Sequence, residues 1–203
     1  MRGWISGLVL FLISIQALSQ KNDYWLRVHD KNDEYGYVDK NGISKIPLGK
    51  YSICYTDTFR NYGIVLFPQK GFFAIDRKQK KLFEVFPFDN GPDHPHDGLF
   101  RIVDNGLIGF VDTRGKIVIK PRFRFAFPFS DGLAAYCEGC VRRNDGEHVY
   151  WLEGKWGFID KTGMIIIAPA YESISQRFEG DKARVKLKGE EFWIDKQGNK
   201  IKP

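Results

Sequence analysis

The side chains best suited to chemistry in this 203-residue chain are its cysteines and histidines. Cys137 and Cys140 form a CxxC pair, a spacing shared by local disulfides, half zinc sites and thiol redox centres. A disulfide requires a turn or bulge at 138–139, because residues three apart on a strand face opposite sides. A zinc site needs two more ligands, of which only His148 is near, and a redox centre needs a strand–turn–helix setting that the sequence lacks. Cys137 and Cys140 are therefore a disulfide candidate, which leaves Cys54 unpaired.

The segment DHPHD at 93–97 sets His94 and His96 between two aspartates. Imidazole and carboxylate groups at this spacing could hold a transition metal. The segment is nevertheless one short loop with Pro95 inside it, and such loops are usually solvated. The sequence therefore predicts no metal site here and no cofactor.

Motifs of nucleophilic, metal-dependent and phosphate-binding enzymes are absent from the sequence. It contains no GxSxG, no HExxH and no GxxxxGK[ST]. Its four histidines sit in unrelated local settings, and no pattern pairs two carboxylates for general acid and base work. The sequence predicts that the protein is not an enzyme.

The first 19 residues have the order of a secretory signal. One cation, Arg2, precedes an apolar run from Trp4 to Leu12, and the small residues Ala17 and Ser19 follow at the two positions that a signal peptidase reads. The alternative is an uncleaved anchor, but the run is shorter than the ~20 apolar residues of a membrane span. No later segment is apolar for long enough to cross a membrane. We expect a signal peptide at 1–19 and an exported chain at 20–203, periplasmic or extracellular, without a membrane span after cleavage.

The composition excludes two further classes. The formal net charge is +6, but the lysines and arginines are scattered, with RKQKK at 77–81 as the densest run. Because no clustered basic face can be drawn, we expect no nucleic-acid binding. Hydrophobic residues make up 43% of the chain, which argues for a packed core and against disorder.

One recurring phrase sets the architecture. Five aspartates mark the same place in five repeats and stand 37, 36, 48 and 35 residues apart: Asp39, Asp76, Asp112, Asp160 and Asp195. Each repeat predicts a short strand, a turn that begins at Asp, a second strand that ends at Pro, an aromatic segment and a third strand. Such a meander buries too little to fold singly, so neighbours must stack. The predicted fold is all-β, a stacked array of three-stranded antiparallel meanders.

The gap of 48 residues marks an insertion at 137–155. Its NDG tripeptide predicts a hairpin turn, so the insertion reads as an inserted hairpin that projects from the array. One strand carries Arg142 and Arg143, and the other carries Tyr150 and Trp151, residue types that anchor interfaces. These four side chains are the predicted binding residues. A solvent-exposed hairpin without a role is the alternative.

The phrase GKWGFIDKTGMIIIAPAYESI at 154–174 resembles the WG-repeat family, bacterial β-rich repeats named after a Trp-Gly pair before the first strand. The pair itself is Trp156-Gly157, whereas Tyr35-Gly36 and Ile108-Gly109 keep only the glycine. The resemblance covers almost all of 20–203. It implies a binding or scaffold module rather than an enzyme.

The two ends of the exported chain look like complementary parts of one repeat. Residues 24–33 read as a third strand, and residues 191–203 read as a first and second strand without a third. Pairing of 24–28 with 192–203 would close a five-repeat ring and remove open sheet edges. The alternative is an open stack whose ends fall within a repeat.

Together these features predict a non-catalytic binding or scaffold protein that presents loops and aromatic side chains to a protein partner. The alternative is a component that binds or processes a cell-envelope glycan. A glycan hydrolase would need two facing carboxylates roughly 5–9.5 Å apart in a cleft.

Overall fold

The computed structural model describes residues 23–146 and 148–202, so the predicted signal peptide at 1–19 lies outside the described residues. The chain divides into an N-terminal unit that ends at Lys80 and a C-terminal unit that begins at Lys81. The described part consists of strands, turns and bends, and it offers no helix that could cross a membrane. The predicted all-β fold is confirmed.

The N-terminal unit contains the sheet β3–β2–β1–β5 and a second group of paired strands, β4–β6–β7. All of these pairs are antiparallel. The strands are β1 (Trp25–His29), β2 (Tyr35–Asp39), β3 (Ser44–Tyr51), β4 (Ile53–Cys54), β5 (Thr58–Phe59), β6 (Gly63–Phe67) and β7 (Gly71–Ile75).

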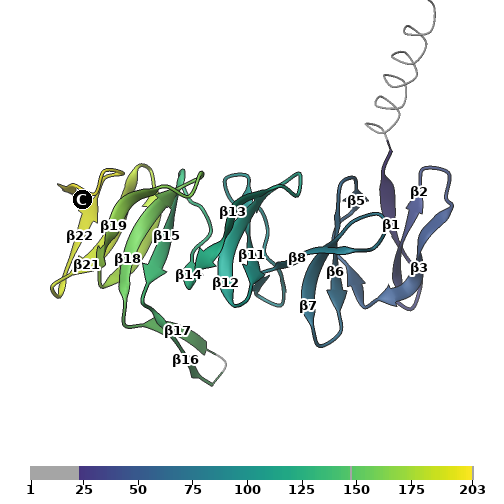
Figure 1. The fold of residues 1–203 in the computed structure, drawn as a ribbon, viewed down its shortest axis with the longest axis horizontal. Helices are drawn as coiled ribbons and strands as arrows, with labels where there is room; N and C mark the ends of the chain where they lie inside the picture. The colour runs from purple at the N-terminus through teal and green to yellow at the C-terminus, as the bar shows by residue number, and fades with distance from the viewer. Residues whose placement is uncertain (1–22, 147, 203) are drawn as a thin grey trace, which may run out of the picture. The chain divides into compact units, whose positions relative to one another are not determined.

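The C-terminal unit contains three groups of four strands, β8–β11–β12–β13, β14–β15–β18–β19 and β20–β21–β22–β23, with the small hairpins β9–β10 and β16–β17 (Figure 1). Its first strands are β8 (Lys81–Val85), β9 (Pro87–Phe88), β10 (Gly91–Pro92), β11 (Leu99–Asp104), β12 (Leu107–Asp112), β13 (Ile117–Phe123), β14 (Phe125–Ala126) and β15 (Leu133–Glu138). The others are β16 (Val141–Asp145), β17 (His148–Leu152), β18 (Lys155–Asp160), β19 (Ile165–Tyr171), β20 (Ser173–Glu179), β21 (Lys182–Leu187), β22 (Glu190–Ile194) and β23 (Lys200–Ile201).

Each meander is built from two sequence repeats. The third strand of one repeat pairs with the first strand of the next, as β11 does with β12, β15 with β18 and β21 with β22. The aromatic segment adds a fourth strand, which is the two-residue β14 in one group and the seven-residue β20 in the next. The predicted antiparallel meander therefore forms, but each sheet combines strands from two consecutive sequence repeats.

This combination of strands from consecutive repeats overturns the predicted pairing of residues 24–28 with 192–203. Strand β1 pairs with β2 on one edge and with β5 on the other, and β22 pairs with β21 and β23. Because a third strand always pairs with the repeat that follows it, the N-terminal fragment completes the first sheet and the C-terminal fragment completes the last. Within residues 23–146 and 148–202, neither terminal strand group lacks a partner that this pairing would have to supply.

The repeated aspartates cap their turns, as predicted. In the third repeat, Asp112 Oδ1 accepts hydrogen bonds from the backbone N–H groups of Arg114 and Lys116, both at 2.9 Å. The N–H of Gly115 donates to the backbone carbonyl of Asp112 at 2.9 Å. The bond from Lys116 is the main reason that the pKa of Asp112 lies below its usual value. Asp39, Asp160 and Asp195 make the same pair of Oδ1 bonds.

The glycine of the Trp-Gly pair lies beneath a bulge in the neighbouring strand. Trp156 faces Tyr171 and Phe158 faces Ile167, so Gly157 alone opposes residues 168–170. A Cβ atom on Gly157 would lie 2.4 Å from the Ile167 carbonyl oxygen. Cβ atoms on Gly36 and Gly109 would likewise lie 2.6 and 2.5 Å from the carbonyl oxygens of Ile46 and Ile119. Only a residue without a side chain fits there.

The same bulges correct the prediction that proline ends the second strand. Pro47, Pro121 and Pro169 lie inside β3, β13 and β19, within the stretches where the register shifts. A bulge leaves a residue without a ladder partner, so a proline, which has no N–H, is tolerated there. The strand then continues to an aromatic residue that packs in the core, such as Phe123 or Tyr171.

Aromatic pairs recur in the core from repeat to repeat. The aromatic residue of the first strand meets a phenylalanine of the following aromatic segment edge-on, at centroid distances of 5.2 Å for Tyr37–Phe59, 4.7 Å for Phe110–Phe129 and 4.9 Å for Phe158–Phe178. All six rings are buried. Edge-to-face pairs of this kind add about 0.5–1.5 kcal/mol each to the burial of their surface.

Successive repeats of the C-terminal unit are also linked through polar groups at their turns. Asp97 Oδ2 accepts a hydrogen bond of 2.6 Å from the N–H of Gly132, and Asp131 Oδ2 accepts one of 2.7 Å from the N–H of Asp181. Lys196 then bridges Asp131 and Asp181 at 3.2 and 2.6 Å. The repeats therefore stack in a fixed register, which positions the segments that form the groove described next.

Candidate functional site

The C-terminal unit contains a groove of about 950 Å³, within the size range of ligand pockets. Its walls come from the segment after β8, from β14 and the residues after it, and from the hairpin β16–β17, which projects from the sheet between β15 and β18 (Figure 1). Two kinds of side chain dominate the lining. The aromatic residues are Phe86, Phe88, Phe125, Phe127, Tyr150, Trp151 and Trp156, and the arginines are Arg101, Arg124, Arg142 and Arg177.

Stacked rings form the apolar wall. Phe125 of β14 stacks on Trp151 of the hairpin, with ring centroids 4.8 Å apart and an interplanar angle of 26°. Phe127 stacks on Trp156 at 5.3 Å and 28°. Phe125 also meets Trp156 edge-on, so the four rings form one continuous cluster. This cluster holds the hairpin against the sheet and fixes the shape of the groove.

The polar lining is mainly cationic. Arg124 and Arg142 are exposed, and neither guanidinium forms a hydrogen bond or ion pair with the residues that the structure describes. Arg177 lies over the Phe127 ring at 5.8 Å. The lining carboxylates are Glu84 and Asp89, and burial raises the pKa of Glu84, which favours its neutral form. The groove therefore offers guanidinium groups beside aromatic rings, a combination that suits an anionic ligand with apolar parts.

Arg101 plays a different part, because it is buried and paired. Arg101 and Asp93 are both 2% exposed. Asp93 Oδ2 accepts bonds from the backbone N–H and Nε of Arg101 at 2.8 and 3.0 Å, and Oδ1 accepts one from Nη2 at 2.9 Å. The guanidinium lies 4.1 Å from the Phe86 ring centroid. The pair thus joins the 86–93 segment to β11 at the wall of the groove.

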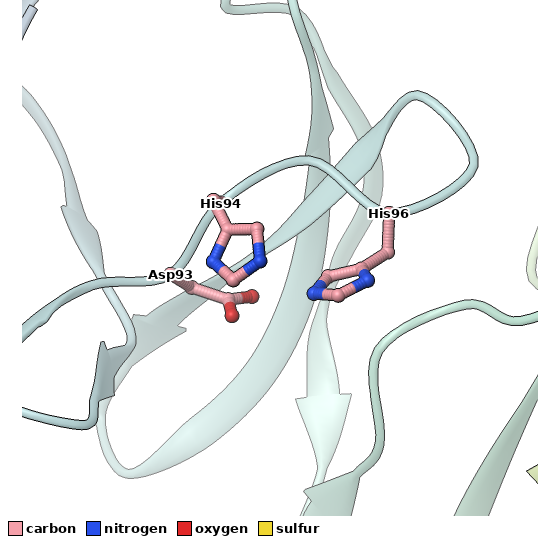
Figure 2. A group of neighbouring side chains, drawn as sticks. All are labelled: Asp93, His94 and His96. Carbon is pink, nitrogen blue, oxygen red and sulfur yellow. The ribbon is translucent and has the colours of Figure 1, made fainter.

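The DHPHD segment is less open than the sequence predicts, because Asp93 is buried in this ion pair. Its carboxylate and the rings of His94 and His96 lie together, with one ligand atom of each within 4.8 Å of the others (Figure 2). His96 lines the groove. Burial and, to a lesser extent, the neighbouring His94 lower the pKa of His96, which favours its neutral form.

The family comparison agrees with this geometry. The model for the WG containing repeat matches residues 108–139, which run from β12 past the end of β15, and residues 156–190, which run from β18 to the start of β22. These two segments are WG repeats. The resemblance drawn from the sequence is confirmed for both. No curated protein matches the chain.

The groove depends on an element that separates the two WG repeats. Residues 140–155 lie between the matched segments and contain the hairpin β16–β17, whose strands pair from Val141–Leu152 to Asp145–His148. Phe125 and Phe127 come from the first WG repeat, and Trp156 begins the second. The stacked rings therefore join both WG repeats to the hairpin between them.

The structure separates the four predicted binding residues. Tyr150, Trp151 and Arg142 line the groove. Arg143 does not line it, and its guanidinium lies 3.6 Å from the Glu153 carboxylate instead. Sequence reasoning missed Arg124, Phe125 and Phe127 of the RFRFAFPF run. The alternation of arginine and aromatic residues in this run was the available signal, but from the sequence we predict only an aromatic segment there.

The two CxxC cysteines are joined where the chain leaves β15 for the hairpin. Cys137 and Cys140 form a disulfide with Cα atoms 5.8 Å apart. Gly139 has φ of +74°, and this left-handed conformation provides the turn that the bridge requires. Cys54 is a buried free thiol of the N-terminal unit, and burial raises its pKa to about 11. An unreactive thiol of this kind is a packing residue.

We expect thiol labelling to report this arrangement. Unfolded without reductant, the chain should react with a thiol reagent once, at Cys54, and after reduction three times. The Cys137→Ser/Cys140→Ser variant should lose about 2 kcal/mol of stability, because the closed loop is short. Three reactive thiols before reduction would show that the bridge is not formed.

Proposed function

We propose that this chain is a non-catalytic, exported binding protein that holds an acidic segment of a partner protein in the groove between its WG repeats and the hairpin. The observation that carries the proposal is the lining, where arginines without ion-pair partners in the described part of the chain stand beside a cluster of aromatic rings. Tryptophan, tyrosine and arginine are the residues that contribute most to protein interfaces.

The charges of the groove indicate which segment would bind. A carboxylate placed between Arg124 and Arg142 would make charge-assisted hydrogen bonds, which are about twice as strong as neutral ones. An apolar or aromatic side chain beside it would cover the exposed part of the ring cluster and of Tyr150. We therefore expect a peptide that alternates acidic and aromatic residues.

Carbohydrate binding is the second candidate. Phe88 and Tyr150 are 48% and 46% exposed at the groove, and exposed rings of this kind can stack on the apolar face of a sugar. The cationic lining would then favour an acidic glycan over a neutral one.

Binding of defined probes distinguishes the two candidates. Fluorescence anisotropy would compare a peptide of alternating Glu and Phe, its Gln counterpart, oligogalacturonate and a neutral chito-oligosaccharide. We expect the acidic peptide to bind at least tenfold more tightly than the Gln peptide, and its affinity to fall with salt because the contacts are partly exposed. Preference for a glycan would favour the second candidate, and binding of none of these probes would contradict both.

Arg142 and Arg143 provide a matched pair of variants for this test. Arg142→Ala should weaken binding of the acidic peptide about tenfold, since loss of one charge-assisted bond costs roughly 1.4 kcal/mol or more. Arg143→Ala changes the same charge one residue along the same strand but outside the groove, so affinity should change less than twofold. Equal effects would show that the hairpin acts only through its net charge.

A further inference from the structure

We propose that His94, His96 and Asp93 form a binding site for one divalent transition metal ion such as Zn²⁺. A ligand atom of each side chain lies within 4.8 Å of the other two. Figure 2 shows the carboxylate and one nitrogen of each ring turned toward a common space. The proposal does not depend on the proposed function of the groove.

The backbone fixes the positions of these ligands. The N–H of Asp93 donates to the Phe86 carbonyl at 2.8 Å. At the other end, His96 and Leu99 exchange two backbone hydrogen bonds, of 2.8 and 3.0 Å. Pro95 limits the freedom of the residues between. Much of the entropy cost of assembling the site is therefore met by the fold itself.

The ligand set suits a transition metal. Two imidazoles and one carboxylate match the preferences of Zn²⁺, whereas Mg²⁺ and Ca²⁺ require oxygen ligands. Ligand atoms on tetrahedral zinc lie roughly 3.4 Å apart, so atoms now up to 4.8 Å apart must approach by at most about 1.4 Å. His94 is exposed and can make that movement without disturbing the core.

Asp93 can serve the metal while it remains paired with Arg101. Its Oδ2 accepts two hydrogen bonds, but Oδ1 accepts only one, from Arg101 Nη2, and retains a lone pair. The guanidinium groups of Arg101 and Arg177 lie close enough to repel the bound metal ion. We therefore expect an affinity on the order of micromolar rather than nanomolar.

Isothermal titration of the full chain with Zn²⁺ tests the site. We expect one ion per chain, and we expect His94→Gln and His96→Gln each to weaken binding at least tenfold. His29→Gln and His148→Gln replace the other histidines and should leave it unchanged. Absence of binding at millimolar Zn²⁺, or affinity equal to wild type in both His94→Gln and His96→Gln, would overturn the proposal.

Two further measurements guard against loss of folding. Zn²⁺ should raise the Tm of the wild type but not that of His94→Gln, whose Tm without metal should match the wild type because the ring is exposed. X-ray absorption at the zinc edge should show two imidazoles in the ligand shell. A shell of oxygen atoms alone would contradict the assignment. Peptide binding to the groove, measured without metal, is a separate result.

Discussion

Asp93→Asn is expected to destabilise the C-terminal unit by about 3–5 kcal/mol, the range for removing one partner of a buried ion pair. Arg101 is 2% exposed and carries a guanidinium charge, so that charge would remain buried without its counter-ion. The amide of asparagine would also point a donor toward a donor of Arg101. Unfolding in urea, followed by tryptophan fluorescence, would measure the change.

Two variants control for this effect. Arg184 and Glu191 form an ion pair at 3.0 Å in the same unit, but their side chains are 47% and 37% exposed. Arg184→Ala should therefore cost less than about 1 kcal/mol. The double variant Asp93→Leu/Arg101→Met removes both buried charges and should recover most of the loss. An Asp93→Asn protein as stable as Arg184→Ala would show that the buried pair is not needed.

The second large effect is expected at Gly157. Gly157→Ala should cost about 3 kcal/mol, at the upper end for an overpacked core, because the new Cβ would lie 2.4 Å from the Ile167 carbonyl and 2.9 Å from the Pro169 nitrogen. Both are backbone atoms, so no side chain can move aside. The bulge in β19 would have to open, and Trp156 beside it would shift. Thermal and urea unfolding would measure the loss.

Gly91 is the matched control. A Cβ at Gly91 would meet only the Phe88 carbonyl oxygen, at 3.8 Å, which is an ordinary contact. Gly91→Ala should therefore change the stability by less than about 0.5 kcal/mol. If both alanine variants lose the same free energy, the close approach of the bulge is not the reason for the glycine.

The same geometry explains why the fifth repeat has lost this glycine. Phe192 takes its place there, and the following strand β23 pairs only through Ile201 with Trp193 and Lys200 with Ile194. No bulge opposite Phe192 appears in this pairing. The Trp-Gly signature is thus a packing requirement of each bulged strand pair, and it disappears where that pair is short.

Local features of the chain were predictable because their causes are local. The Asp turns, the short strands and the all-β fold follow from side chains that bond the backbone two and four residues on, as Asp112 does. The turn at Gly139 that allows the Cys137–Cys140 bridge has an equally local cause. The resemblance to WG repeats rests on such features, because a repeat is a local pattern that recurs.

The strand partners were not predictable in the same way. The sequence divides into repeats at the Asp turns. This division predicts that each repeat forms its own sheet and that residues 24–28 pair with residues 192–203 to complete one. Instead, the third strand of one repeat pairs along its edge with the first strand of the next, as β15 does with β18. The prediction for Pro47, Pro121 and Pro169 was also wrong, because a bulge depends on the facing strand and not on the proline alone.

The binding groove and the DHPHD site belong to the tertiary structure. Arg101 lies in β11 among apolar residues. Its guanidinium can be buried there because the Asp93 carboxylate accepts its hydrogen bonds and neutralises its charge. Phe125 and Trp151 are 26 positions apart in the sequence and stack because the hairpin folds back. By itself the sequence determined the repeat, its turns and the residue types available for binding. The tertiary structure alone decided which of those residues meet, because burial and stacking are properties of pairs that the chain order does not bring together.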